Sequence, residues 1–182
     1  MEEYRMKEIS WNEAIELGSP YPYTLVVTID KDGKPDAMGL SWWTITSWDP
    51  HMIAIAIGGP RYTHECIEQC KEFVLCFPSE DLEKGAWLCG QVSGREADKF
   101  KEAGFRQVPS KMVKPPIIEG STVAYECKVV DQIETGDHTL YIGKVVAIHG
   151  TPEKKKHLFT IHYRKVISLD KDGYSNFHLQ HE

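Results

Sequence analysis

A strand pattern broken by a tight turn most constrains the fold of this chain. Residues 24–29 are rich in strand-forming side chains and lead into the turn Asp30-Lys31-Asp32-Gly33, after which residues 37–47 return. An Asp-Gly pair between two such runs is a strong local signal for a β-hairpin. We therefore predict an antiparallel pair formed by residues 24–29 and 37–47.

Further strand patterns follow along the chain. Residues 52–57 alternate large and small side chains, which predicts one face packed in a core and one face open to close approach by another group. Several antiparallel strands with short inserted helices favour a small β-barrel, mainly β in class, because closure leaves few exposed edges. The other predicted strands are 73–77, 123–129, 139–149, 166–169 and 174–179, with turns at 135–138 and 170–173.

Short helices are predicted between the strands from their capping residues and stop signals. A parallel sheet would need strands and helices in regular alternation, and this order is not seen. The four predicted helices are residues 9–18 with Ser10 as N-cap, a helix capped by Thr63 and ending near Glu72, a helix opened by Ser79, and a helix opened by the capping box Ser93-Gly94-Arg95-Glu96 and ended by Gly104.

Size and composition narrow the class of protein. The 182 residues fit one domain, 1–182, with 41% hydrophobic and 26% charged residues, as in globular proteins. A net charge of −6 argues against nucleic-acid binding, which requires excess cations. No apolar run reaches the roughly 20 residues that cross a membrane, and the N-terminus lacks a signal-peptide pattern. Five cysteines without paired spacing indicate reduced thiols, so we expect a cytoplasmic protein.

The sequence lacks the motifs of several common enzyme classes. There is no Gly-x-Gly-x-x-Gly fingerprint, no P-loop, no nucleophile elbow and no set of residues with zinc-ligand spacing. His64-Glu65 resembles the start of a zinc-protease helix, but Glu68 stands where the second histidine is needed. We therefore expect no metal, and a bound cofactor as the source of any chemistry.

Aromatic, hydroxyl and cationic residues gather in two neighbouring segments. Trp42 and Trp43 stand within a run of hydroxyl residues, and Gly58-Gly59-Pro60-Arg61 leads into a predicted helix start. Paired tryptophans suit a planar aromatic ligand, and a cationic helix start suits a phosphate. Together these residues point to a bound flavin.

Four motifs in order carry a family resemblance. Residues 39–50, Gly-Leu-Ser-Trp-Trp-Thr-Ile-Thr-Ser-Trp-Asp-Pro, resemble the core motif of the flavin reductase-like family of FMN-binding split barrels, which includes flavoredoxins and archaeal ferric reductases. The likeness covers about residues 20–150 and implies an antiparallel, Greek-key-like split barrel that binds FMN non-covalently, uses a nicotinamide dinucleotide and forms a homodimer. The other matching segments are Arg61-Tyr62-Thr63, Ser93-Gly94-Arg95 through Asp98-Lys99-Phe100, and Gly136-Asp137-His138 followed by residues 140–145.

An FMN phosphate would favour the N-terminus of the helix that follows Arg61, where free N–H groups and the positive end of the helix dipole face outward. Arg61 supplies a fork of donors and Thr63 a hydroxyl. A surface salt bridge is the simpler alternative for Arg61. The resemblance adds Tyr62 to this group, and the ribityl or phosphate oxygens would be reached from Thr44, Thr46 or Ser47.

Three further groups are expected around the flavin ring. Trp42 and Trp43 point to opposite faces of a regular strand, so only one packs in the core, and the sequence does not say which. Ser41 is placed to hydrogen-bond the polar edge of the ring. The resemblance implies that Lys99 offers charge to the phosphate or the reduced ring, and that His138 lies near the flavin or nicotinamide face; a solvated surface position is the alternative for both.

These features predict a flavin-dependent NAD(P)H oxidoreductase that passes electrons through FMN to ferric iron, free flavin or a redox protein. Two alternatives remain open. The first is a flavoredoxin-type electron carrier without its own NAD(P)H site, and the second is a redox-inert flavin-binding sensor.

Overall fold

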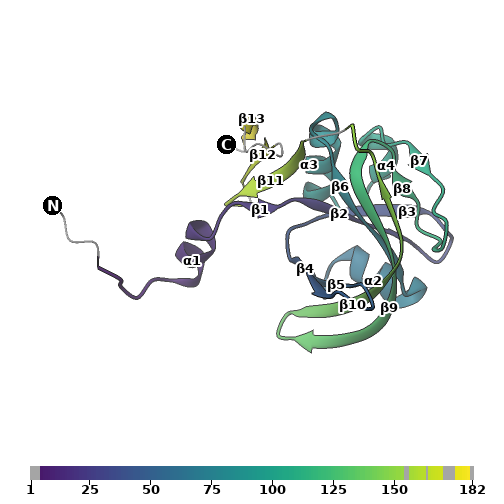
Figure 1. Ribbon diagram of the computed structural model, residues 1–182, viewed down its shortest axis with the longest axis horizontal. Helices are drawn as coiled ribbons and strands as arrows, with labels where there is room; N and C mark the ends of the chain where they lie inside the picture. Colours follow the sequence, from purple (N-terminus) through teal and green to yellow (C-terminus); the bar gives the residue numbers. More distant parts are fainter. Residues whose placement is uncertain (1–4, 154–155, 163, 170–174, 181–182) are drawn as a thin grey trace.

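The computed structural model describes residues 5–153, 156–162, 164–169 and 175–180 (Figure 1). The mainly β class predicted from the sequence is confirmed: antiparallel sheets form the body, and short helices cover it. The strands are β1 (Tyr21–Pro22), β2 (Thr24–Ile29), β3 (Pro35–Leu40), β4 (Trp43–Ser47), β5 (Met52–Gly58), β6 (Glu72–Pro78), β7 (Gln107–Val108), β8 (Ile117–Ile118), β9 (Ser121–Thr135), β10 (His138–Gly150), β11 (His157–Ile161), β12 (Lys165–Leu169) and β13 (Ser175–Gln180).

The main sheet closes on itself through a two-residue join. Its strand order is β3-β2-β6-β9-β10-β5-β4, and every neighbouring pair is antiparallel. β3 and β4 are therefore the two edges of this sheet, yet only Ser41 and Trp42 separate them in sequence. The end of β3 and the start of β4 must therefore lie close together, so the sheet curls toward a barrel.

This join corrects the single return strand predicted over residues 37–47. The predicted hairpin with residues 24–29 ends where Leu40 pairs with Thr24. Trp43 then pairs with Ile55 of β5, so the chain has left one edge and joined the other. The side-chain pattern continues through the junction because both halves are strand; only the pairing partner changes.

Both faces of β2 are buried. On β2, Val26 belongs to the core inside the barrel, while Leu25 and Val27 belong to a second core under the helices. The alternation predicted for residues 52–57 is confirmed in the same way: Ile53, Ile55 and Ile57 pack inside the barrel, and the small side chains face the other side.

A smaller sheet, ordered β1-β11-β12-β13, flanks the barrel. Its last two strands pair antiparallel, as predicted for residues 166–169 and 174–179, although residues 170–174 with the predicted turn lie outside the described residues. β9 and β10 form a long hairpin that projects from the barrel (Figure 1). No helix in the described part of the chain has the length and apolar character needed to cross a membrane.

The helices differ from prediction mainly at their starts. α1 (Trp11–Leu17) has the predicted cap, with Ser10 and Glu13 forming a capping box, and it projects away from the barrel without burying any residue (Figure 1). α2 (Tyr62–Cys70) begins one residue before Thr63, so the predicted Thr63 cap is wrong. Its end is two residues before the predicted Glu72, because Lys71 adopts a left-handed conformation.

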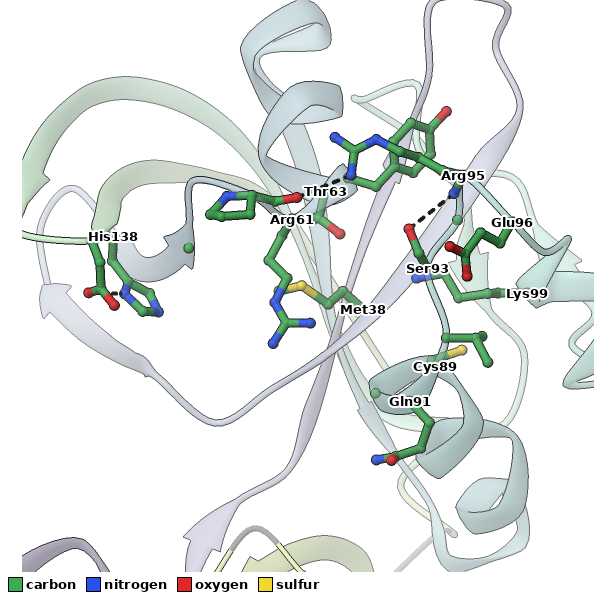
Figure 2. Close-up of a pocket in the computed structure, with 17 residues that line it drawn as sticks. Met38, Arg61, Thr63, Cys89, Gln91, Ser93, Arg95, Glu96, Lys99 and His138 are labelled. Atoms are coloured by element: carbon green, nitrogen blue, oxygen red, sulfur yellow. Dashed lines mark hydrogen bonds and ion pairs between the residues drawn. The ribbon is translucent and has the colours of Figure 1, made fainter. Parts of the chain in front are cut away.

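The helix opened by residue 79 is confirmed as a 3-10 turn, Glu80–Leu82, followed by α3 (Glu83–Gln91). The capping box predicted at Ser93 is wrong. α4 covers only Lys99–Glu102 and is capped by Asp98, whose side chain accepts a hydrogen bond from the Lys101 N–H. Residues 93–97 instead form a turn that lies beside the start of α2 (Figure 2).

Candidate functional site

A cavity of about 560 Å³ opens where α2 begins (Figure 2). The turn of residues 93–96, the end of α3, the start of α4 and the start of β10 enclose it. The first turn of α2 faces this space, and the N–H groups of a first helical turn lack intrahelical acceptors. The cavity therefore has the backbone geometry of an anion site.

A second cavity, of about 330 Å³, adjoins the first. Its wall is more aromatic, with Tyr23, Trp42 and Trp87, and it includes the hydroxyl groups of Ser41 and Thr160. The two cavities form one cleft because both are lined by the same six residues, namely Met38, Gly58, Arg61, Gly90, Gln91 and His138.

A buried ion pair lies at the floor of the first cavity. Lys99 and Asp36 are each only 3% exposed, and Lys99 Nζ lies 3.0 Å from Asp36 Oδ1. The hydroxyl of Thr63, also buried, donates to Asp36 Oδ2 at 3.4 Å. Burial raises the pKa of the Asp36 carboxyl above its usual value, and the charge of Lys99 opposes that rise. Residues from β3, α2 and α4 thus meet at the Asp36 carboxylate.

The two arginines at the rim behave differently. Arg95 donates to the Pro60 carbonyl at 3.1 Å and to Glu65 Oε2 at 3.0 Å, and its guanidinium lies over the Tyr62 ring. Arg95 therefore ties the turn of residues 93–96 to α2. The Arg61 guanidinium has no such partner among the described residues, and it extends into the space between His138 and Gln91 (Figure 2).

His138 and Trp42 form one aromatic corner of the cleft. Their ring centroids lie 4.6 Å apart with an interplanar angle of 34°. His138 Nδ1 lies 2.7 Å from Asp137 Oδ1, which leaves Nε2 as the ring nitrogen that can face a ligand. The imidazole next to Asp137 also lowers the pKa of that carboxyl. Because Trp42 is 39% exposed, this corner combines an accessible aromatic surface with a proton-carrying group.

Seven of the predicted site residues line the cleft, and four do not. Ser41, Trp42, Arg61, Tyr62, Thr63, Lys99 and His138 come together there. Trp43 instead packs edge-on against Phe77, with ring centroids 5.0 Å apart. Of the two tryptophans, Trp43 is therefore the one that packs on the core, and Trp42 is the one that lines the cleft. Thr44 and Thr46 are exposed on β4, and Ser47 lines a separate apolar cavity of about 240 Å³.

Some cleft residues could not be found from the sequence because their place depends on distant pairing. Asp36 is the clearest case: it stands one residue before the return strand predicted over residues 37–47, and its partner Lys99 lies 63 positions away. Tyr23, Trp87 and Thr160 have ordinary core character in sequence. Cys89 also lines the first cavity, but burial raises the pKa of its thiol to about 12, so it stays protonated and is not a nucleophile.

Comparison with known proteins places this chain in a family. A family model described as the flavin reductase like domain matches residues 17–167. An uncharacterized protein of Archaeoglobus fulgidus is 37% identical over 131 residues, which cover 71% of this chain and 74% of the relative. That match and the family model rest on sequence alone and do not depend on the cleft.

Solved structures agree on the fold. Flavoredoxin of Desulfovibrio vulgaris (Miyazaki F) has a TM-score of 0.72 and 26% identity, covering 97% of this chain and 96% of that one. An NADH:FAD oxidoreductase of Streptomyces globisporus has a TM-score of 0.76 and 18% identity, covering 97% of this chain and 99% of that one. The resemblance seen in the sequence motifs is confirmed, and this chain belongs to the flavin reductase-like family of FMN-binding split barrels.

Proposed function

We propose that this protein, as a single domain over residues 1–182, binds FMN non-covalently and takes hydride from NAD(P)H. The electrons then pass to an acceptor such as ferric iron, free flavin or a redox protein. One observation carries the proposal: a cationic cavity at a helix N-terminus is continuous with an aromatic-lined cavity. A ligand with a phosphate at one end and a planar ring at the other matches both halves.

The first cavity would hold the phosphate. The N–H groups of the first turn of α2 and the guanidinium of Arg61 supply donors suited to phosphate oxygens. Thr63 and Lys99 add a hydroxyl and an ammonium group from the floor. Tyr62 is held by Arg95 and by Asp30, to which its hydroxyl donates at 3.2 Å, so it shapes the wall.

The second cavity would hold the ring. FMN, when bound, supplies the acceptor of a hydride and the donor of electrons in a later step. Trp42 offers a flat apolar surface, and Ser41 a hydroxyl for the polar edge of the ring. His138, oriented by Asp137, can hold or release a proton at Nε2 as the charge of the site changes. Thr44, Thr46 and Ser47, expected from the sequence to reach the ribityl or phosphate oxygens, lie outside the cleft and are not assigned a contact.

The proposal is tested on freshly purified protein. We expect flavin absorbance bands, FMN as the flavin released on denaturation, and bleaching of the bands when NADH or NADPH is added without air. Colourless protein that does not quench the fluorescence of added FMN would refute flavin binding. Flavin that dithionite reduces but neither nicotinamide reduces would refute the NAD(P)H step alone.

A flavoredoxin-type carrier is the second candidate, and the 26% identity with a flavoredoxin over nearly the whole chain favours it. A carrier would hold flavin that NAD(P)H reduces slowly and a partner protein reduces quickly. Stopped-flow reduction with each donor separates the two functions. A redox-inert flavin sensor, the third possibility, would keep its flavin oxidised with dithionite present.

We also propose a homodimer and a cytoplasmic location. Ile45, Trp48 and Ile148 expose large apolar side chains around the 240 Å³ cavity, and Trp48 is 81% exposed. Such a patch is typical of a subunit interface. Analytical ultracentrifugation tests the dimer.

The proposed cytoplasmic location is supported by the cysteines. All five are free thiols, which suits a reducing compartment.

A further inference from the structure

Asp36 contacts two groups of the proposed phosphate site, although FMN binding does not itself require a carboxylate there. Its oxygens lie 3.0 Å from Lys99 Nζ and 3.4 Å from Thr63 Oγ1, which are the two donors at the cavity floor. These are the same two groups that would meet the FMN phosphate. All three side chains are buried, but only Lys99 and Thr63 line the cavity, so Asp36 lies behind them.

The surroundings hold the carboxylate in place. Asp36 lies on β3, where it pairs with Thr28 of β2, and the Gly94 backbone packs against its side chain. A Cβ atom on Gly94 would clash with Asp36 Oδ1, so the turn of residues 93–96 closes directly over the carboxylate. Strand pairing and the turn of residues 93–96 therefore hold Asp36 beside Lys99 in this structure.

We propose that Asp36 is an internal counter-ion that competes with the ligand's phosphate for Lys99 and Thr63, and so sets how tightly the site holds a phosphorylated flavin. This inference rests on the proposed FMN function. A phosphate that reaches Lys99 and Thr63 brings its negative charge close to a buried carboxylate, and like charges in a poorly solvated place repel strongly. Part of the attraction offered by Lys99 is thereby cancelled.

The same arrangement explains how the empty site stays folded. A buried ammonium without a counter-ion is strongly destabilising, and Asp36 supplies that counter-ion. Removing the charge of Asp36 should therefore weaken the ligand-free protein. In a variant without the Asp36 charge, a bound phosphate would become the partner of Lys99. Phosphate binding should therefore raise the stability of that variant by more than it raises the stability of the wild type.

The variant Asp36→Asn tests this inference because it removes the charge and keeps the shape. The matched control is Asp32→Asn, the same change in the exposed turn between β2 and β3. Dissociation constants for FMN and for riboflavin, which lacks the phosphate, are measured by quenching of flavin fluorescence. We expect Asp36→Asn to bind FMN about tenfold or more tightly, with riboflavin changed less than about twofold.

A second measurement uses inorganic phosphate as the probe and does not depend on FMN. Phosphate should raise the melting temperature of Asp36→Asn by more than that of the wild type or of Asp32→Asn. If Asp36→Asn does not fold, Asp36→Ser repeats both measurements, since a hydroxyl can still accept from Thr63.

The outcomes are distinct. Wild-type protein that binds neither flavin refutes the proposed function, and the phosphate measurement then decides the counter-ion role separately. Wild-type protein that binds FMN, with equal or weaker FMN binding in the folded Asp36 variant, overturns the inference and leaves the function intact. Equal tightening for FMN and riboflavin also overturns it, because the gain would not come from the phosphate.

Discussion

Replacing Arg61 with alanine removes a cation that nothing else in the described structure uses. Arg61 is the N-cap residue of α2, but its side chain makes no capping bond, and no described residue pairs with its guanidinium. Alanine at this position therefore leaves no buried group unsatisfied, and any loss of FMN affinity reports on the phosphate contact itself.

The magnitude follows from the exposure of the residue. A hydrogen bond to a charged group contributes about 1.5–3 kcal/mol. Arg61 is exposed at the rim, where solvent and salt screen its charge, so we expect the lower part of that range. At 1.4 kcal/mol for each factor of ten, the dissociation constant for FMN should rise about 10- to 30-fold.

The assay is fluorescence titration of Arg61→Ala with FMN and riboflavin at two salt concentrations. FMN binding should weaken and depend less on salt, while riboflavin binding stays within about twofold of the wild type. Arg95→Ala is the comparison: it removes a cation from the same rim, but one already used by Pro60 and Glu65, so it should loosen the turn of residues 93–96 with a smaller effect on salt dependence. An unchanged FMN dissociation constant in Arg61→Ala would refute the phosphate role.

Three other changes test the remaining features. His138→Ala should lower turnover with NAD(P)H by about 10²-fold or more while flavin content stays near that of the wild type, and unchanged steady-state kinetics would remove His138 from the reaction. Gly94→Ala should lower FMN affinity and destabilise the protein by about 1–3 kcal/mol, because its Cβ would lie 2.6 Å from Tyr62 Cδ1, whereas Gly59→Ala, with open space around it, should do neither in chemical denaturation and titration. Backbone N–H groups of Lys111 and Met112 donate to the buried Glu126, and they and His149 hold its pKa below the usual value against the opposing effect of burial. Its stabilising contribution is therefore present above the unfolded pKa of about 4.3 and is lost as the pH falls through the folded value. Glu126→Gln should cost about 1–3 kcal/mol at neutral pH and flatten the acid limb of the stability curve, and an unchanged acid limb would contradict this assignment.

Local signals in the sequence predicted local structure well. The turn before Gly33 forms as expected, with a φ of +81° that suits glycine, and Ser10 caps its helix. The Ser93 capping box failed because Asp98, five residues later, offers an equally good cap, and the sequence cannot rank two caps within one short segment.

Features that depend on distant partners were out of reach. Alternation shows that Trp42 and Trp43 face opposite ways, but only the barrel shows that Trp42 lines the cleft and Trp43 packs on Phe77. Likewise Thr63 has the character of a helix cap, and what draws its hydroxyl elsewhere is Asp36, which is 27 positions away and adjacent only after folding. The side-chain pattern of the sequence identifies the strands and helices. Which of their faces come into contact is decided by strand pairing and packing between residues that are far apart in the sequence.

The two-residue join between β3 and β4 gives part of the cleft very little freedom to vary. Ser41 and Trp42 both bridge the seam of the barrel and contribute wall to the aromatic cavity. Lengthening this segment to reshape the cavity would release the constraint that keeps the end of β3 near the start of β4. Attempts to alter ligand preference by mutagenesis therefore have more scope at Gln91, which lines the same space from the end of α3, than at the seam itself.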